Sequence, residues 1–198
     1  MNAFQRYIDK FKIYNQLSNI GEIARRYFAM NAFDGVLTII GVLMGNYTAG
    51  VENPQIVVTT GLATCVAMGI SGLWGAYLTE AAERERELSE LEGVTLTSLR
   101  ETRLGEASRA AVVIVAVVDG LSPFMAAMIV LLPFFFAQLF PTIRWVYLTA
   151  LGLSLLTLFL LGVFLGRVSR QNIILYGFRT VIAGGISIVI SLLLGASH

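Results

Sequence analysis

The sequence AMNAFDGVLTIIGVLMG, residues 29–45, is apolar along most of its length but contains one aspartate, Asp34. A second stretch of the same kind, AAVVIVAVVDGLSPFMAAMIV, residues 110–130, contains Asp119. An ionised carboxylate in the middle of a membrane helix costs about 3 kcal/mol on insertion scales, so it normally faces a cavity or a partner. Both aspartates are therefore candidate functional residues. A buried hydrogen bond with a purely structural role is the alternative for each.

The composition around these stretches predicts an all-α integral membrane protein. Hydrophobic residues make up 56% of the chain and charged residues 14%, with a mean hydropathy of +0.74. Such values lie outside the range of ordinary soluble domains. Because a hydrocarbon core of about 30 Å needs about 20 helical residues, the apolar runs predict five transmembrane helices. Their predicted ranges are 28–49, 56–78, 110–136, 145–165 and 173–194.

The basic residues predict the orientation of the chain in the membrane. Thirteen of the fourteen lysines and arginines fall before the first span, between the second and third, or between the fourth and fifth spans or at their edge. Only Arg144 falls on the opposite side. By the positive-inside rule, the N-terminus is expected in the cytoplasm and the C-terminus outside, in the plasma membrane of a prokaryote. The thirteen residues are Arg6, Lys10, Lys12, Arg25, Arg26, Arg84, Arg86, Arg100, Arg103, Arg109, Arg167, Arg170 and Arg179.

Residues 1–198 are expected to form one membrane domain with two cytoplasmic elements. Apolar residues at roughly helical spacing in 1–26 predict an amphipathic helix lying on the lipid surface. The second helix should start at Pro54, after an Asn53 cap, and continue past the membrane to a glycine cap at Gly93. A capping box of Ser98 and Glu101 should start the next helix, so that 80–109 forms a short acidic hairpin.

The aspartate of the first span lies on a helix face of polar and small residues. Asp34, Thr38, Gly41 and Gly45 follow one another at i, i+4, i+7 and i+11, which places them on one side of a helix. The two glycines form a GxxxG pair, which permits close approach of another helix. In the third span, Pro123 removes a helical hydrogen bond and is expected to kink or break the helix near Asp119.

Four acidic residues on the predicted cytoplasmic extension, Glu80, Glu83, Glu87 and Glu90, fall within an arc of about 80° at 100° per residue. Oxygen ligands clustered in this way could hold a divalent cation. In the alternative interpretation, Arg84 and Arg86 pair with these glutamates at i+3 or i+4 spacing and the helix is simply solvated.

Other classes of chemistry have little support. Cys65 is the only cysteine and His198 the only histidine, which excludes a disulfide framework and a Cys/His metal cluster. No catalytic residue, cofactor or nucleic-acid partner is predicted. An intramembrane enzyme or a non-transporting scaffold or regulatory protein remains the alternative to a transporter. The residues around Asp34 and Asp119 nevertheless lack the G-x-G-D pattern of intramembrane proteases and the D-G-x-x-A-R pattern of phosphatidyl transferases.

Several segments in order resemble the vacuolar iron transporter (VIT) family. They are the Asp-Gly pair of the first span and the sequences GISGLWGAYLTEAAERERE at 69–87, GLSPFMAAMIVLLPFFF at 120–136 and GRVSRQNIILYGFRTVIAGGISIVISLLLG at 166–195. The resemblance covers nearly all of residues 28–196. It implies a five-span homodimer, embedded in membrane lipid, that exchanges Fe²⁺ or Mn²⁺ for protons. It also implies that Asp34 is a metal ligand.

The sequence departs from the family pattern in its soft ligands. Where the family has a transmembrane methionine, this chain has Gly72, and the nearest methionine is Met68, one turn earlier. The family also has a membrane glutamate one to two turns earlier on that helix, where this chain has Thr64 or a neighbour. The expected metal-binding residues are Asp34, Asp119, Met68, Glu80, Glu83, Glu87 and Glu90.

Overall fold

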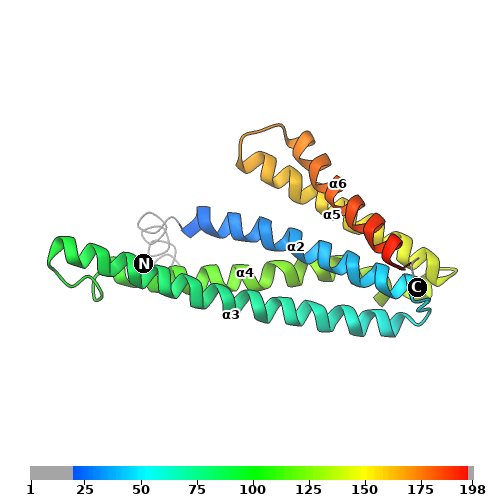
Figure 1. Ribbon diagram of the computed structural model, residues 1–198, viewed down its shortest axis with the longest axis horizontal. Helices are drawn as coiled ribbons and strands as arrows, with labels where there is room; N and C mark the ends of the chain where they lie inside the picture. The colour runs from blue at the N-terminus through cyan, green and yellow to red at the C-terminus, as the bar shows by residue number, and fades with distance from the viewer. Residues whose placement is uncertain (1–19, 196–198) are drawn as a thin grey trace, which may run out of the picture. The chain divides into compact units, whose positions relative to one another are not determined.

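A computed structural model describes residues 20–195, and in this part of the chain the fold is helical (Figure 1). Within this range five helices are long and apolar enough to cross a membrane, as predicted from the hydropathy. The elements in chain order are α2 (Ile20–Thr48), α3 (Pro54–Thr95), α4 (Arg103–Phe135), the short 3₁₀ helix η1 (Ala137–Leu139), α5 (Ile143–Val168) and α6 (Ile173–Gly195).

The helices form two compact units. Among the described residues, the first contains 20–28 together with Ile70–Leu121, and the second contains Ala29–Gly69 together with 122–195. The long helices α2, α3 and α4 contribute residues to both units. The predicted surface helix at 1–26 lies mostly outside the described residues, and its last residues belong to α2.

The second unit has a hydrophobic core whose buried residues come from α2, α3, α4 and α5, and α6 packs along α5 with Ile188 against this core. Tyr147 is fully enclosed in this core, and its hydroxyl donates a hydrogen bond to the Val51 carbonyl, 3.0 Å away. The α5–α6 hairpin is tied by Thr180, whose hydroxyl donates to the Leu158 carbonyl at 2.7 Å. Gly177 provides room for the ring of Phe159, because a Cβ at this glycine would come within 2.6 Å of the ring.

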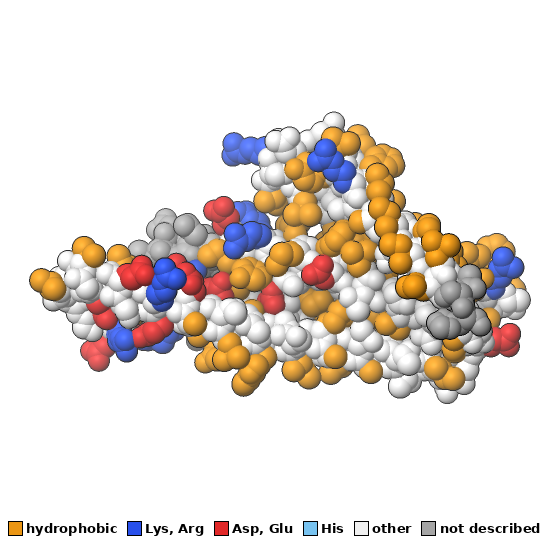
Figure 2. Space-filling model, in the orientation of Figure 1, with side chains coloured by type: hydrophobic (Ala, Val, Ile, Leu, Met, Phe, Trp, Pro, Cys, Tyr) orange, Lys and Arg blue, Asp and Glu red, His pale blue; other side chains and the backbone are white. Residues whose placement is uncertain are grey.

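The first unit contains the hairpin of α3 and α4. Helix α3 runs for 42 residues, or about 63 Å at 1.5 Å per residue, so it extends well beyond a hydrocarbon core of about 30 Å. This confirms the predicted extension, and Figure 2 shows charged side chains gathered over the end of the hairpin. The sequence continues from Thr95 through residues 96–102 into α4.

The predicted caps at this end of the hairpin are wrong. Helix α3 continues through Gly93 to Thr95, and Leu96 takes the left-handed conformation, with φ 53°. Helix α4 begins at Arg103 rather than after a Ser98 cap. The hydroxyl of Ser98 and the backbone N–H of Leu99 donate instead to Glu92, at 3.3 and 2.6 Å. The side chain of Glu92 therefore organises the turn.

Two other local predictions have opposite outcomes. Helix α3 begins at Pro54, and the side chain of Asn53 accepts a hydrogen bond from the Gln55 N–H at 2.9 Å, which confirms the predicted cap. Of the kink or break expected at Pro123, the break does not occur, because helix α4 runs on to Phe135. Ala126 and Ala127, in the following turn, are buried, so packing holds the helix together across the missing hydrogen bond.

Candidate functional site

Asp34 lies on α2 with its side chain exposed on the surface of the single chain. The backbone carbonyl of Asp34 accepts a hydrogen bond from the Thr38 hydroxyl at 2.8 Å, which is an ordinary contact within a helix. Within residues 20–195, no hydrogen bond or ion pair reaches the carboxylate. A carboxylate so placed, in a helix long enough to span the membrane, requires a polar cavity or a partner.

The rest of this face of α2 is also uncovered. Thr38 is exposed, and a Cβ added at Gly41 or Gly45 would meet nothing within 4 Å. Further along, the side-chain amide of Asn46 donates to the Thr60 hydroxyl of α3 at 3.3 Å. The hydroxyl of Thr64, one turn after Thr60, donates to the Thr60 backbone carbonyl at 2.8 Å. This face, defined here by Asp34, Thr38, Gly41 and Gly45 and called the Asp34 face, is polar or small at each of these positions.

Asp119 belongs to the first unit and has quite different surroundings. It is 7% exposed, and it lies on α4 against the backbone of α3 at Gly72. A Cβ at Gly72 would come within 3.0 Å of the Asp119 carbonyl oxygen and 3.1 Å of its Oδ2. The absence of a side chain at Gly72 is therefore what gives the Asp119 carboxylate its space.

The glutamates of the hairpin form ion pairs with the arginines between them. Arg84 lies 3.5 Å from Glu80 and 3.1 Å from Glu87, and Arg86 lies 2.9 Å from Glu90. These pairs match the alternative interpretation of the acidic arc. Within residues 20–195, no group of three Asp, Glu, His or Cys side chains is arranged to hold a metal ion.

Glu80 has a partner that the sequence interpretation missed. The Tyr27 hydroxyl of α2 donates a hydrogen bond to Glu80 Oε1 at 3.4 Å. The signal was available in the sequence, because Tyr27 precedes Asp34 by seven residues and therefore lies on the same stripe of α2. Glu83, in contrast, is exposed on the hairpin.

Met68 is half-buried and packs against the hydrophobic core of the second unit. Its environment is that of a core methionine, whose flexible side chain fills irregular space. Cys65, one turn before it, is fully buried, and neither residue has a carboxylate in its immediate helical turn.

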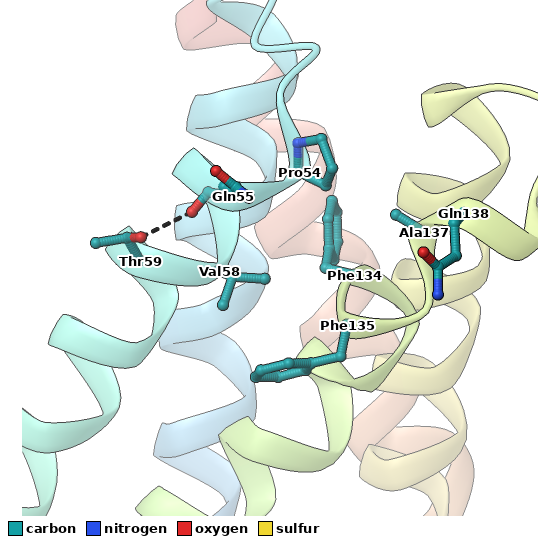
Figure 3. A pocket seen from close by; sticks show the side chains of 8 residues that line it. All are labelled: Pro54, Gln55, Val58, Thr59, Phe134, Phe135, Ala137 and Gln138. Carbon is teal, nitrogen blue, oxygen red and sulfur yellow. Dashed lines mark hydrogen bonds between the residues drawn. The ribbon is translucent and has the colours of Figure 1, made fainter.

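A pocket of about 470 Å³ lies between the start of α3 and the end of α4 (Figure 3). Its polar groups are the amides of Gln55 and Gln138 and the hydroxyl of Thr59, which donates to the Gln55 backbone carbonyl at 2.8 Å. Phe134 and Phe135 supply much of the apolar lining. The pocket has no acidic lining residue, so its donors do not suit a divalent cation.

Comparison with known proteins identifies the family to which the chain belongs. The family model of the VIT family matches residues 26–101 and 95–196. The chain belongs to the VIT family. An uncharacterized protein of the archaeon Methanocaldococcus jannaschii is 30% identical over 173 residues, covering 86% of this chain and 87% of the relative. Positions 34, 72 and 119 lie within the ranges that the family model matches, and membership of the VIT family indicates metal-ion transport by a multi-pass membrane protein.

Proposed function

We propose that this VIT-family protein is a divalent metal cation transporter in which Asp34 binds the transported ion. The observation that carries the proposal is the exposure of the Asp34 carboxylate on a membrane helix. In lipid, that position would be costly for an ionised group, whereas a cation beside it would compensate its charge. The hydroxyl of Thr38, one turn away, adds a neutral oxygen to the same face.

A second copy of the chain is the proposed cover for the Asp34 face. Gly41 and Gly45 have no neighbour within 4 Å of an added Cβ, so another helix backbone can approach them closely. In a homodimer with two-fold symmetry, such a face meets its own equivalent. Two Asp34 carboxylates would then face each other across one path, with the N-terminus on the cytoplasmic side of the prokaryotic plasma membrane.

The donors available suit a hard or borderline cation. Carboxylate and hydroxyl oxygens favour Mn²⁺ among the transition-metal ions, with Fe²⁺ the next candidate. A carboxylate oxygen that binds a metal ion cannot hold a proton at the same time, so metal ions and protons compete for Asp34. Exchange of the metal ion for protons follows from this competition.

The test is uptake of Mn²⁺ and Fe²⁺ into proteoliposomes under an imposed pH gradient. Asp34→Asn should abolish metal uptake, because the amide keeps the shape but loses the charge. Glu52→Gln is the matched control, since Glu52 is an exposed carboxylate in the connection between α2 and α3. The control should transport normally. Undiminished uptake by the Asp34→Asn protein would contradict the proposal.

The dimer has its own test. Gly41→Leu should convert the detergent-solubilised protein from dimer to monomer, measured as the mass of the protein by light scattering. Gly152→Leu is the control, because Gly152 also has open space around it but lies on α5. A Gly41→Leu protein that stays dimeric would show that another surface forms the interface.

A further inference from the structure

Glu80 is held from two sides in the first unit. Its Oε1 accepts the hydrogen bond from the Tyr27 hydroxyl of α2 at 3.4 Å, and its Oε2 lies 3.5 Å from Nε of Arg84 on α3. The side chains of Glu80 and Arg84 are each only 12% exposed. The guanidinium of Arg26 lies over the Tyr27 ring, 5.7 Å from its centroid, and helps to fix the ring.

Among three ion-paired glutamates of the acidic arc, Glu90, Glu87 and Glu80, the side-chain exposure falls toward Glu80. The side chain of Glu90 is 66% exposed and that of Glu87 is 51% exposed, whereas Glu80 is largely covered. Arg84 joins Glu87 to Glu80 through its two ion pairs. A cation that moves along these carboxylates toward the membrane therefore meets Glu80 last, where the contact with α2 begins.

Helix α2 connects this contact to the Asp34 face. It is unbroken from Ile20 to Thr48, so Tyr27, Asn31 and Asp34, at i, i+4 and i+7, lie on one stripe of the helix. Asp34 follows Tyr27 by about 10 Å along the helix axis at 1.5 Å per residue. Tyr27 is thus a polar residue of this stripe that reaches an acidic residue of α3.

Arg84 and a divalent cation compete for the same carboxylate. With Tyr27 absent, both oxygens of Glu80 are available to Arg84, since a guanidinium binds a carboxylate best through two parallel hydrogen bonds. The Tyr27 hydroxyl is neutral and occupies one oxygen without supplying positive charge. It therefore keeps one side of the carboxylate directed toward α2 and limits the pairing with Arg84.

We propose that Tyr27 is a positioning residue for metal entry, which holds the Glu80 carboxylate toward α2 so that this carboxylate can receive a cation that enters where α2 and α3 meet. This inference rests on the proposed transport function and assigns its cytoplasmic entry. Nothing in it requires Tyr27 to bind the metal ion itself.

The experiment compares Tyr27→Phe, Glu80→Gln and the double variant in Mn²⁺ uptake by proteoliposomes of the full-length protein. Tyr27→Phe keeps the ring and removes only the hydroxyl. It should raise the Mn²⁺ concentration for half-maximal uptake about fivefold and leave the maximal rate within about twofold, as expected for loss of one hydrogen bond of ordinary strength. In the Glu80→Gln background, Tyr27→Phe should have no further effect. Tyr47→Phe, at the other end of α2, should behave as the wild type.

Other results would overturn either the role of Tyr27 or the proposed transport function. An unchanged half-maximal concentration in Tyr27→Phe overturns the inference, and so does a fivefold change that persists in the Glu80→Gln background. Absence of metal uptake by the wild type overturns the proposed function instead. In that case equilibrium binding of Mn²⁺ to the solubilised protein, read by electron paramagnetic resonance, replaces uptake. Equal binding by wild type and Tyr27→Phe, or no binding by either, then overturns the role of Tyr27.

Discussion

The backbone of α2 at Gly35 lies directly against the backbone of α4 at Pro123: a Cβ added to Gly35 would come within 2.6 Å of both the Cα and the carbonyl oxygen of Pro123. Gly35 immediately follows Asp34, so this contact fixes the part of α2 that carries the intramembrane carboxylate. The glycine of the first Asp-Gly pair is therefore required by packing.

Gly35→Ala should destabilise the protein, because the added Cβ would clash with the backbone of Pro123, which cannot shift as a flexible side chain can. We expect a loss of about 1–3 kcal/mol, the usual range for overpacking, measured as a lower midpoint of thermal unfolding in detergent. Gly152→Ala is the control and should be neutral or slightly stabilising, since its Cβ would lie in open space. Equal unfolding midpoints for the two variants would show that α2 and α4 can separate at this point without cost.

Gly72→Ala should disturb Asp119 more than it disturbs the fold. The added Cβ would lie 3.0–3.1 Å from Asp119 and Gly120 atoms, a distance at which a shift of a few tenths of an ångström relieves the clash. We expect a small change in unfolding midpoint and a several-fold loss of Mn²⁺ uptake. Gly75→Ala, three residues along α3 and in open space, should leave uptake unchanged. Normal Mn²⁺ uptake by the Gly72→Ala protein would show that the surroundings of Asp119 do not matter for transport.

The exposed glutamates of the hairpin should concentrate cations without limiting the rate. Replacement of Glu83, Glu87 and Glu90 together by Gln should weaken the apparent affinity for Mn²⁺ and leave the maximal uptake nearly intact. The effect should fade at high salt, because the Debye length is about 8 Å at physiological ionic strength. Glu80→Gln alone should lower the maximal rate as well. If neither variant changes uptake, the ion pairs with Arg84 and Arg86 have a structural role only.

The turn between α3 and α4 should open in acid. Glu92 lies about 21 Å along α3 beyond residue 78, outside the predicted membrane span. The backbone hydrogen bond from Leu99, with a smaller contribution from Ser98, lowers the pKa of Glu92 below its ordinary value of 4.5. Because the pKa is lower in the folded state, the stabilisation is complete above about pH 4.5 and is lost as the pH falls through the folded-state pKa.

Amide hydrogen exchange across residues 96–102 measures this opening. After correction for the intrinsic effect of pH, the wild type should lose protection below about pH 4.5. Glu92→Gln removes the titrating group, so its protection should be independent of pH over the same range. A wild-type turn that stays equally protected in acid would mean that contacts other than the Glu92 carboxylate hold it.

The existence of the helices could be predicted from sequence, but the ends of α3 and α4 at the turn between them could not. Apolar runs of sufficient length determine the spans, and the Asn53-Pro54 start is a purely local signal. The end of α3 depends on Glu92, whose carboxylate reaches across the turn to Leu99. Gly93, two residues before the true end, is a typical local signal for the end of a helix, and it was misleading here. The contact that decides the end joins residues seven apart in the sequence, so no local cap motif indicates it.

The candidate site was predictable only in part. The cost of a carboxylate in lipid was enough to select Asp34 and Asp119, but sequence did not indicate that one is exposed and the other buried. That difference depends on which helix faces each residue, such as α3 at Gly72. Tyr27 was missed because an aromatic residue near the start of a span is also typical of a membrane-interface anchor.

The contacts between α5 and α6 restrict how this hairpin can move. Gly177 accommodates Phe159, and the Thr180 hydroxyl bonds the Leu158 carbonyl across the pair. A slide by one residue, or a rotation of either helix, would drive a ring into a backbone and break this hydrogen bond. We therefore expect α5 and α6 to move as one rigid pair, and any motion between helices during transport to involve the others. Distances between spin labels on α5 and α6 should therefore stay constant with and without Mn²⁺ and across a change of pH.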